Sequence, residues 1–210
     1  MKILPRFIAL APVRSIPMAL CLLVGVCAES ACSRSAPSEL KATLKTWNAE
    51  AETKTVDDAM HWYQASTDDE KKLARSFATE AIATARLSKA AREKWGHDAE
   101  TVIAHLCSTD TLDDDNTATV TGFGDHVTVK LAASEVAPIH LVKSNGVWRV
   151  NVASYIRIIG PKLQSAMKYS DQFSAMADKT TAAIIAGKYA SSQDAADAVR
   201  AAIAGLDAEQ

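Results

Sequence analysis

The sequence predicts an α+β fold, in which N-terminal helices pack on a four-stranded antiparallel meander sheet and two further helices follow at the C-terminus. Two observations carry this prediction. Apolar residues recur with helical spacing over 38–107 and again over 161–206, but they alternate with a period of two over 116–154. In addition, Asn145-Gly146 separates two alternating runs, and this pair is typical of a β-hairpin with a type I′ turn.

The helix starts are marked by residues that cap helices. Thr67-Asp68-Asp69-Glu70 is a capping box, with acidic residues in the first turn where the helix dipole favours them. The helix that follows is expected to stop at Gly96, and Asp98 is expected to cap the next one. Pro161 suits the first position of the helical region after the sheet. The expected helical segments are 38–51, 56–64, 67–95, 98–107, 161–187 and 191–206.

The two-residue turn fixes the register of the last hairpin. Side chains alternate between the two faces of a strand, so Trp148 is expected on the buried face with Leu141 and Val150, and Arg149 on the other face. Residues 122–125 join the first two strands as a second hairpin. The expected opposite pairs in the last hairpin are Ser144–Val147, Lys143–Trp148, Leu141–Val150 and Ile139–Val152.

The first 28 residues have the order of a secretory signal peptide. Lys2, Arg6 and Arg14 precede the apolar run 16–26, and Ala28 supplies the small residue at the cut. The apolar run is too short to span a bilayer comfortably. We therefore expect export to the periplasm, with cleavage after Ala28.

The cysteines near the expected cleavage site leave two kinds of processing of the signal peptide open. Simple cleavage is one, and lipidation at Cys27 or Cys32 is the other, which would make a lipid anchor the chain's only contact with a membrane. Residues 29–37 are expected to be a polar tether, and 38–207 a single domain. If Cys32 stays unmodified, an oxidising compartment would permit a disulfide with Cys107.

Composition limits the class of function. With 48% hydrophobic and 23% charged residues among 210, the chain is an ordinary globular candidate. Removing residues 1–28 leaves 20 basic against 25 acidic residues, a net charge of −5. Nucleic-acid binding needs a concentrated basic face, and the sequence contains none, so no nucleic-acid partner is expected.

The order of helices and strands, together with a turn-Gly-x-Trp pattern over residues 145–152, is similar to that of the nuclear transport factor 2-like superfamily. The resemblance covers about residues 38–155, and the most similar members are exported bacterial proteins of unknown function, often lipoproteins. It implies a sheet curled around the helices into a cone with a pocket. About 50 residues of helix after the last strand depart from the family, and Ile184, Ile203 and Leu206 of this tail are able to fill the pocket.

A pocket, if present, is expected where the helices face the sheet, because the large apolar surfaces of matching length lie there. Convergent polar groups are few at this place, so the ligand is expected to be small and apolar. The residues expected to line the pocket are Trp47, Met60, Trp62, Phe77, Leu141 and Val150.

Enzymes of the resembling superfamily use an Asp or His inside the cone as a general base, and His61 and His105 are the residues that fit this role here. The structural alternatives are a solvent-facing His61 and a satisfied core His105. His126 and His140 supply two imidazoles, whereas zinc sites need three or four ligands, so no metal and no cofactor is expected. The phosphate-loop, nucleophile-turn and zinc-protease motifs are absent from the sequence.

Three functions stay open. We favour an exported, non-catalytic envelope domain that binds a small apolar ligand or another envelope protein. The first alternative is a pocket enzyme of the isomerase, dehydratase or hydrolase kind. The second is a structural or dimerising module that forms a homodimer through the outer face of the sheet.

Overall fold

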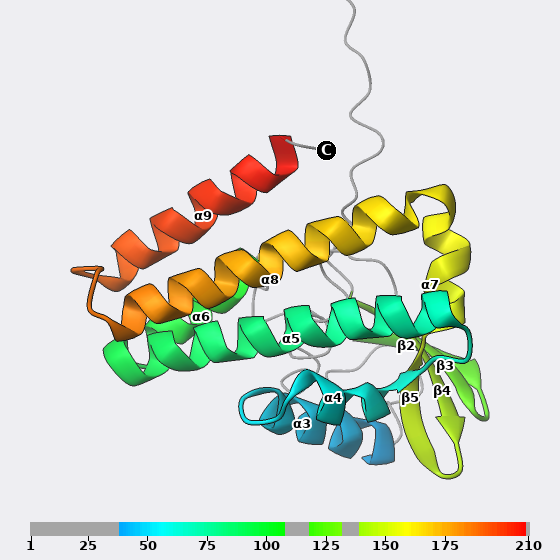
Figure 1. Cartoon of the computed structure of the whole chain (residues 1–210). Coiled ribbons are helices and arrows are strands. Elements are labelled where there is room, and N and C mark those ends of the chain that lie inside the picture. The colour runs from blue at the N-terminus through cyan, green and yellow to red at the C-terminus, as the bar shows by residue number, and fades with distance from the viewer. Residues whose placement is uncertain (1–37, 108–117, 132–138, 209–210) are drawn as a thin grey trace, which may run out of the picture.

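The computed structural model describes residues 38–107, 118–131 and 139–208. The expected leader and tether, with Cys27 and Cys32, lie outside the described residues. Within them the fold is α+β, as predicted, with helices before and after a five-stranded mixed sheet (Figure 1). The elements are α3 (Ser38–Ala51), α4 (Val56–Ala59), the 3-10 turn η1 (Met60–Trp62), β1 (Tyr63–Gln64), α5 (Asp68–Trp95), α6 (His97–Cys107), β2 (Ala118–Phe123), β3 (His126–Leu131), β4 (Ile139–Ser144), β5 (Val147–Asn151), α7 (Val152–Ile159), the 3-10 turn η2 (Gly160–Lys162), α8 (Leu163–Ile185) and α9 (Ser192–Ala208).

The capping box at the start of the longest helix, α5, is confirmed. The Thr67 hydroxyl accepts a hydrogen bond from the Glu70 amide at 3.2 Å, and the Glu70 carboxylate accepts one from the Thr67 amide at 3.3 Å. Thr55 and Asp58 form the same reciprocal pair before α4. At the other end of α5, Gly96 follows with a φ of 92°, a conformation that L side chains rarely adopt. Local sequence therefore sets both ends of α5.

The sheet has the strand order β1-β5-β4-β3-β2. Strands β2 to β5 form the predicted antiparallel meander. The prediction of a sheet with four strands, all antiparallel, is wrong in one respect, because β1 adds a fifth strand parallel to β5, with Tyr63 opposite Val150. Two residues are too few to show a strand period, so β1 is a product of tertiary pairing.

The last hairpin has the predicted turn. Asn145 and Gly146 have φ values of 52° and 77°, as a type I′ turn requires. The pair Ile139–Val152 was wrongly expected, because β5 ends at Asn151 and Val152 begins α7. The Tyr155 hydroxyl, on α7, accepts a hydrogen bond from the backbone amide of His140 at 3.1 Å. This bond occupies a β4 amide one residue beyond Leu141–Val150, the last pair of the β4–β5 ladder. The pairs Leu141–Val150, Lys143–Trp148 and Ser144–Val147 are confirmed.

Three helix boundaries differ from the prediction. The segment 56–64 is a single turn of α-helix followed by η1 and β1. Helix α6 begins at His97, so Asp98 lies in its first turn instead of capping it. Pro161 lies in η2, between α7 and α8, because the chain turns there before the long helix starts. The sheet therefore ends at 151 instead of 154, and three α-helices follow it instead of two within 139–208.

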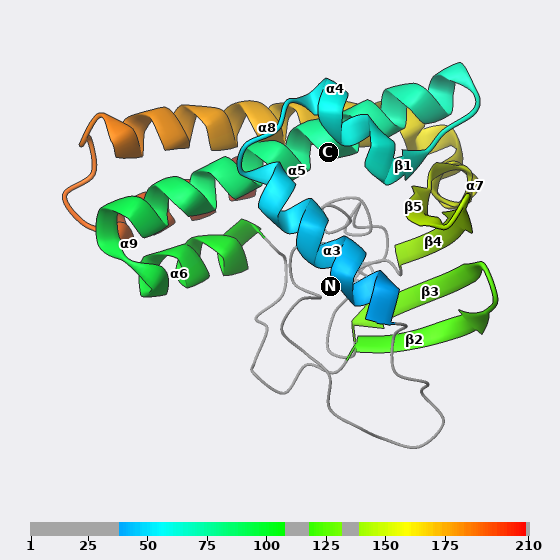
Figure 2. The ribbon, with the colours of Figure 1, turned by 90° about the horizontal axis from the view of Figure 1, so that it is seen from below.

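The helices α5 and α8 lie side by side (Figures 1 and 2). They carry two hydrophobic cores along their length. At one end, the sheet, α3 and the first half of α5 enclose the first core. At the other end, α6, α9 and the second halves of α5 and α8 enclose the second. Ile184, Ile203 and Leu206 belong to this second core, so these tail residues do not fill the space between helices and sheet. None of the helices in the described ranges combines the length and apolar character needed to cross a membrane.

Candidate functional site

The residues expected to line a pocket lie together where the helices meet the sheet, as the pattern predicted. Trp47, Trp62 and Phe77 from the helical side share the first core with Leu141 and Val150 of the sheet. All five are buried, between 0% and 3% exposed, and Met60 packs against them at the edge. These side chains form a packed core, and ligand binding among them stays a prediction.

Aromatic rings in this core contact one another in a row. The ring centroids of Trp47 and Trp62 are 6.2 Å apart, and those of Trp62 and Tyr63 are 6.4 Å apart. Phe77 continues the row, 6.4 Å from Tyr63 and 5.8 Å from Tyr155, where the two rings meet edge to face. Such spacings are those of favourable aromatic pairs. The row therefore joins α3, η1, α5 and α7 into one structural unit.

His61, the first candidate general base, lies at the rim of this core. Its Nδ1 is 2.5 Å from the carbonyl oxygen of Asp58, and its Nε2 is 3.3 Å from the Glu50 carboxylate. The same Glu50 oxygen accepts a hydrogen bond from the Trp62 indole at 2.7 Å. A general base needs a ring nitrogen that can reach a substrate proton. Because both nitrogens of His61 face acceptors of the protein itself, this geometry favours a bridging role for the side chain. His105, the second candidate, lies in α6, and its side chain is outside the described set.

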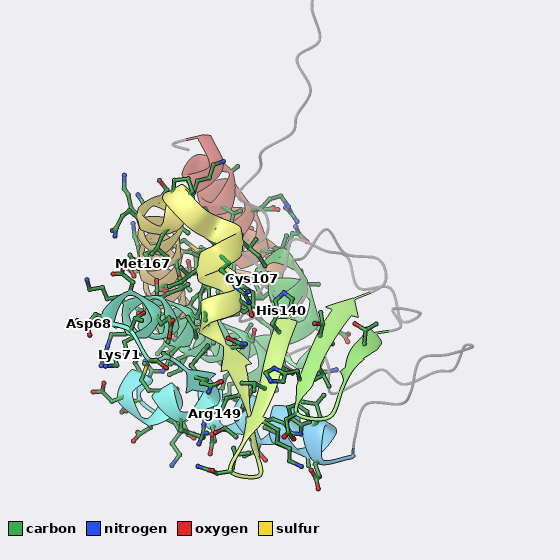
Figure 3. The ribbon with its side chains drawn as sticks, turned by 90° about the vertical axis from the view of Figure 1, so that its right-hand side faces the viewer. Asp68, Lys71, Cys107, His140, Arg149 and Met167 are labelled. Atoms are coloured by element: carbon green, nitrogen blue, oxygen red, sulfur yellow. The ribbon has the colours of Figure 1, made fainter. Side chains whose placement is uncertain are left out.

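His140 lies on β4 of the sheet (Figure 3). Its Nδ1 is 3.1 Å from the Thr128 hydroxyl, and its ring meets the Tyr155 ring at 5.7 Å. Burial, and secondly the positive charge of Arg157, lower the pKa of His140. The pairing of β3 with β4 places His126 opposite Val142. Within the described residues, no three or more His, Cys, Asp or Glu side chains gather as metal ligands.

A polar seam runs between α5 and α8, in the interior. The carboxylate of Glu80 is fully buried and accepts a hydrogen bond from the Ser170 hydroxyl at 2.5 Å. Ser174 donates to the backbone carbonyl of Ser170 at 2.7 Å. Buried polar groups paired across two helices fix how the helices align.

Cys107, at the end of α6, is a buried free thiol. Burial, and secondly the charge of Glu80, raise the pKa of Cys107 to about 12, so the side chain has no thiolate character.

A groove of about 940 Å³ lies between α8 and α9, away from the sheet. Its walls are mostly methyl and other apolar side chains, because alanines occupy the facing positions of the two helices. Residues of the turn between the helices close one end. The lining residues are Ala175, Met176, Lys179, Thr180, Ala182, Ala183, Ala186, Lys188, Tyr189, Ala198, Ala202 and Leu206.

Two positive charges stand among these apolar walls. Lys179 comes from the C-terminal third of α8 and Lys188 from the turn after this helix. The lining contains no acidic side chain. The groove can therefore hold an apolar molecule, and the charged groups in its lining are all positive.

Sequence reasoning missed the groove. Its signal is a stripe of alanines, in which Ala182 on α8 and Ala186 just after this helix line the groove together with Ala198 and Ala202 on α9. Such a stripe is also what closely packed helices need, and that interpretation is the more common one. The bridge from His61 to Glu50 was missed as well, because the two residues are eleven positions apart in different elements.

Comparison of the chain with protein-family models, with curated proteins and with solved structures finds no match. The resemblance to the nuclear transport factor 2-like superfamily stays a prediction, and the function is argued from the geometry.

Proposed function

We propose that this protein is an exported, non-catalytic domain that binds a small, mostly apolar molecule in the groove between α8 and α9. The size and lining of the groove carry the proposal. A volume of about 940 Å³ is at the upper end of that found for small-molecule sites, which are mostly apolar with a few polar groups. An apolar molecule placed there leaves water and gains contacts with both helices.

The lining favours binding over catalysis. It contains no imidazole, carboxylate or thiol, the groups that most often act as general bases or nucleophiles. The Thr180 hydroxyl lies within 3.9 Å of the Met176 sulfur on its own helix. The aromatic core, which the sequence indicated as the pocket, is filled by its own rings, so the proposal places the ligand at the other end of α5 and α8.

Export enters the proposal through the order of residues 2–28. Charged, apolar and small residues follow one another there as in a secretory signal. N-terminal sequencing of the protein from fractionated cells of its native host tests this part. A protein that starts after Ala28 in the envelope fraction supports export, and unprocessed chain in the cytoplasm contradicts it.

Binding is tested with Nile red, a neutral apolar dye whose emission rises in apolar surroundings. We expect the native protein to enhance the emission, and the dye to raise the melting temperature, because a ligand that binds only the native state stabilises it. Ala202→Leu places three extra carbon atoms in the groove and should weaken binding about tenfold or more. Ala201→Leu is the matched control, since Ala201 is exposed on the same helix and outside the lining. Equal dye binding by both variants would contradict the proposal.

A further inference from the structure

We infer that the ligand of this groove is an anionic amphiphile, a single unbranched apolar chain that ends in a carboxylate. This inference rests on the proposed function and adds the chemical class of the ligand. Two properties of the groove support it, the length of the apolar walls and the state of the two lysines.

The apolar walls are long compared with a compact small molecule. Along α8 the lining extends from Ala175 to Ala186, the residue that follows the helix, a rise of about 16 Å at 1.5 Å per residue. Along α9 it extends from Ala198 to Leu206, a rise of about 12 Å. Apart from Lys179 and Thr180, the walls between these ends carry methyl groups and the Met176 thioether. A medium-length acyl chain, lying along the two helices, contacts this whole length.

Among the described residues, the two lysines of the groove have no partner of their own. Neither Lys179 nor Lys188 forms an ion pair or a hydrogen bond through its ammonium group with any residue in the described ranges. Lys143 and Lys94 differ in this respect, since Lys143 contacts the Glu39 carboxylate and Lys94 donates to the Ile184 carbonyl, whereas Lys168 on α8 likewise has no such contact within the described ranges.

These two ammonium groups decide the sign of the ligand's polar end. With no acidic side chain in the lining, the groove attracts an anion and repels a cation. Lys188 lies at the turn that closes one end of the groove, and Lys179 lies two to three turns earlier along the chain. A carboxylate near this end lets the apolar chain extend toward Met176 and Leu206.

The test compares three probes with the same twelve-carbon chain: dodecanoate, dodecanol and dodecyltrimethylammonium. Each is titrated into the full chain with bound Nile red, below the concentration at which micelles form. We expect dodecanoate to displace the dye at about a three- to tenfold lower concentration than dodecanol, since exposed ion pairs contribute modestly. The cation should be the weakest, and added salt should narrow the differences because it screens exposed charges.

Charge-removing variants assign the preference to the groove. In Lys179→Gln/Lys188→Gln, dodecanoate should lose its advantage while dodecanol binds as before. Lys168→Gln is the matched control, because Lys168 is exposed on the same helix and outside the lining. Titrated directly, with the melting temperature as the readout, dodecanoate should stabilise Ala202→Leu less than the unchanged chain, which separates groove binding from binding elsewhere on the chain.

The outcomes separate this inference from the proposed function. If dodecanol and dodecanoate compete equally, or the double variant keeps the preference, the headgroup inference is overturned while groove binding stands. If no probe displaces the dye, or Ala202→Leu changes nothing, the proposed function fails and this inference fails with it. A preference for the cation would overturn the inference alone.

Discussion

Trp148, in the middle of β5, should be one of the most costly positions to truncate. Its side chain is 2% exposed and belongs to the first core. Burial of an aromatic side chain removes about 150–250 Å² from water, which at about 25 cal/mol per Å² corresponds to roughly 4–6 kcal/mol. A compact unfolded state reduces this figure by about 10–40%. We therefore expect Trp148→Ala to lower the free energy of unfolding by about 3–5 kcal/mol, in the range typical of such truncations.

Arg149→Ala is the matched control, because Arg149 is the next residue along β5 and lies on the opposite face of the strand. Its Nε donates to the His61 carbonyl at 3.1 Å, and its Nη1 donates to the Ser144 carbonyl at 3.4 Å. The loss of these hydrogen bonds should cost about 1–2 kcal/mol. Urea unfolding followed by far-ultraviolet circular dichroism measures both variants, with the slope m as a check that the unfolded state is unchanged. Equal destabilisation by the two variants would refute the assignment of the sheet faces.

Three further predictions concern single side chains. Burial lowers the pKa of His140, so as the pH falls the unfolded chain binds a proton at His140 before the folded protein does. The stability should therefore be full above about pH 6.5 and fall at lower pH. His140→Gln should reduce this fall, as measured by urea unfolding at several pH values. If the free energy of unfolding depends on pH in the same way with and without the substitution, the prediction is contradicted. Cys107, with a pKa of about 12, should react with iodoacetamide only after unfolding, as peptide mapping would reveal; labelling of the native protein would count against its burial. His61→Ala should cost about 1 kcal/mol or less and leave Nile red binding unchanged, whereas loss of dye binding would indicate a ligand near Glu50.

Elements coded by neighbouring residues could be predicted from the sequence. The capping box of Thr67 and Glu70 and the turn at Asn145-Gly146 depend on residues within four positions of one another. Once the turn was fixed, the alternation along β4 and β5 placed Trp148 on the buried face. Local chemistry and hydrophobic period agree at these places, so the prediction and the structure agree too.

Elements that depend on distant partners could not be predicted. Strand β1 exists because Tyr63 and Gln64 pair with residues more than eighty positions later. Residues 152–159 contain valine, tyrosine and isoleucine, which are common in strands, and yet they form α7. Here the burial of Tyr155 against Phe77 and its bond to His140 outweigh the local preference.

The site was the hardest part to predict, for a related reason. The large apolar residues correctly indicated a core, because Trp62 and Phe77 do meet Leu141 and Val150. A core and a pocket have the same hydrophobic pattern, however, and only the packing of the rings distinguishes them. The groove arises from small residues on α8 and α9, where alanine is compatible with both contact and space.

The central claim is that a ligand lies between α8 and α9, and alanine-methyl NMR with dodecanoate tests it most directly. The account predicts that titration shifts the methyl signals of Ala183, Ala198 and Ala202, which line the groove. The methyl signals of Ala74 and Ala78, which are fully buried in the aromatic core, should stay in place. Shifts confined to Ala74 and Ala78, or no shifts at all, would contradict the account.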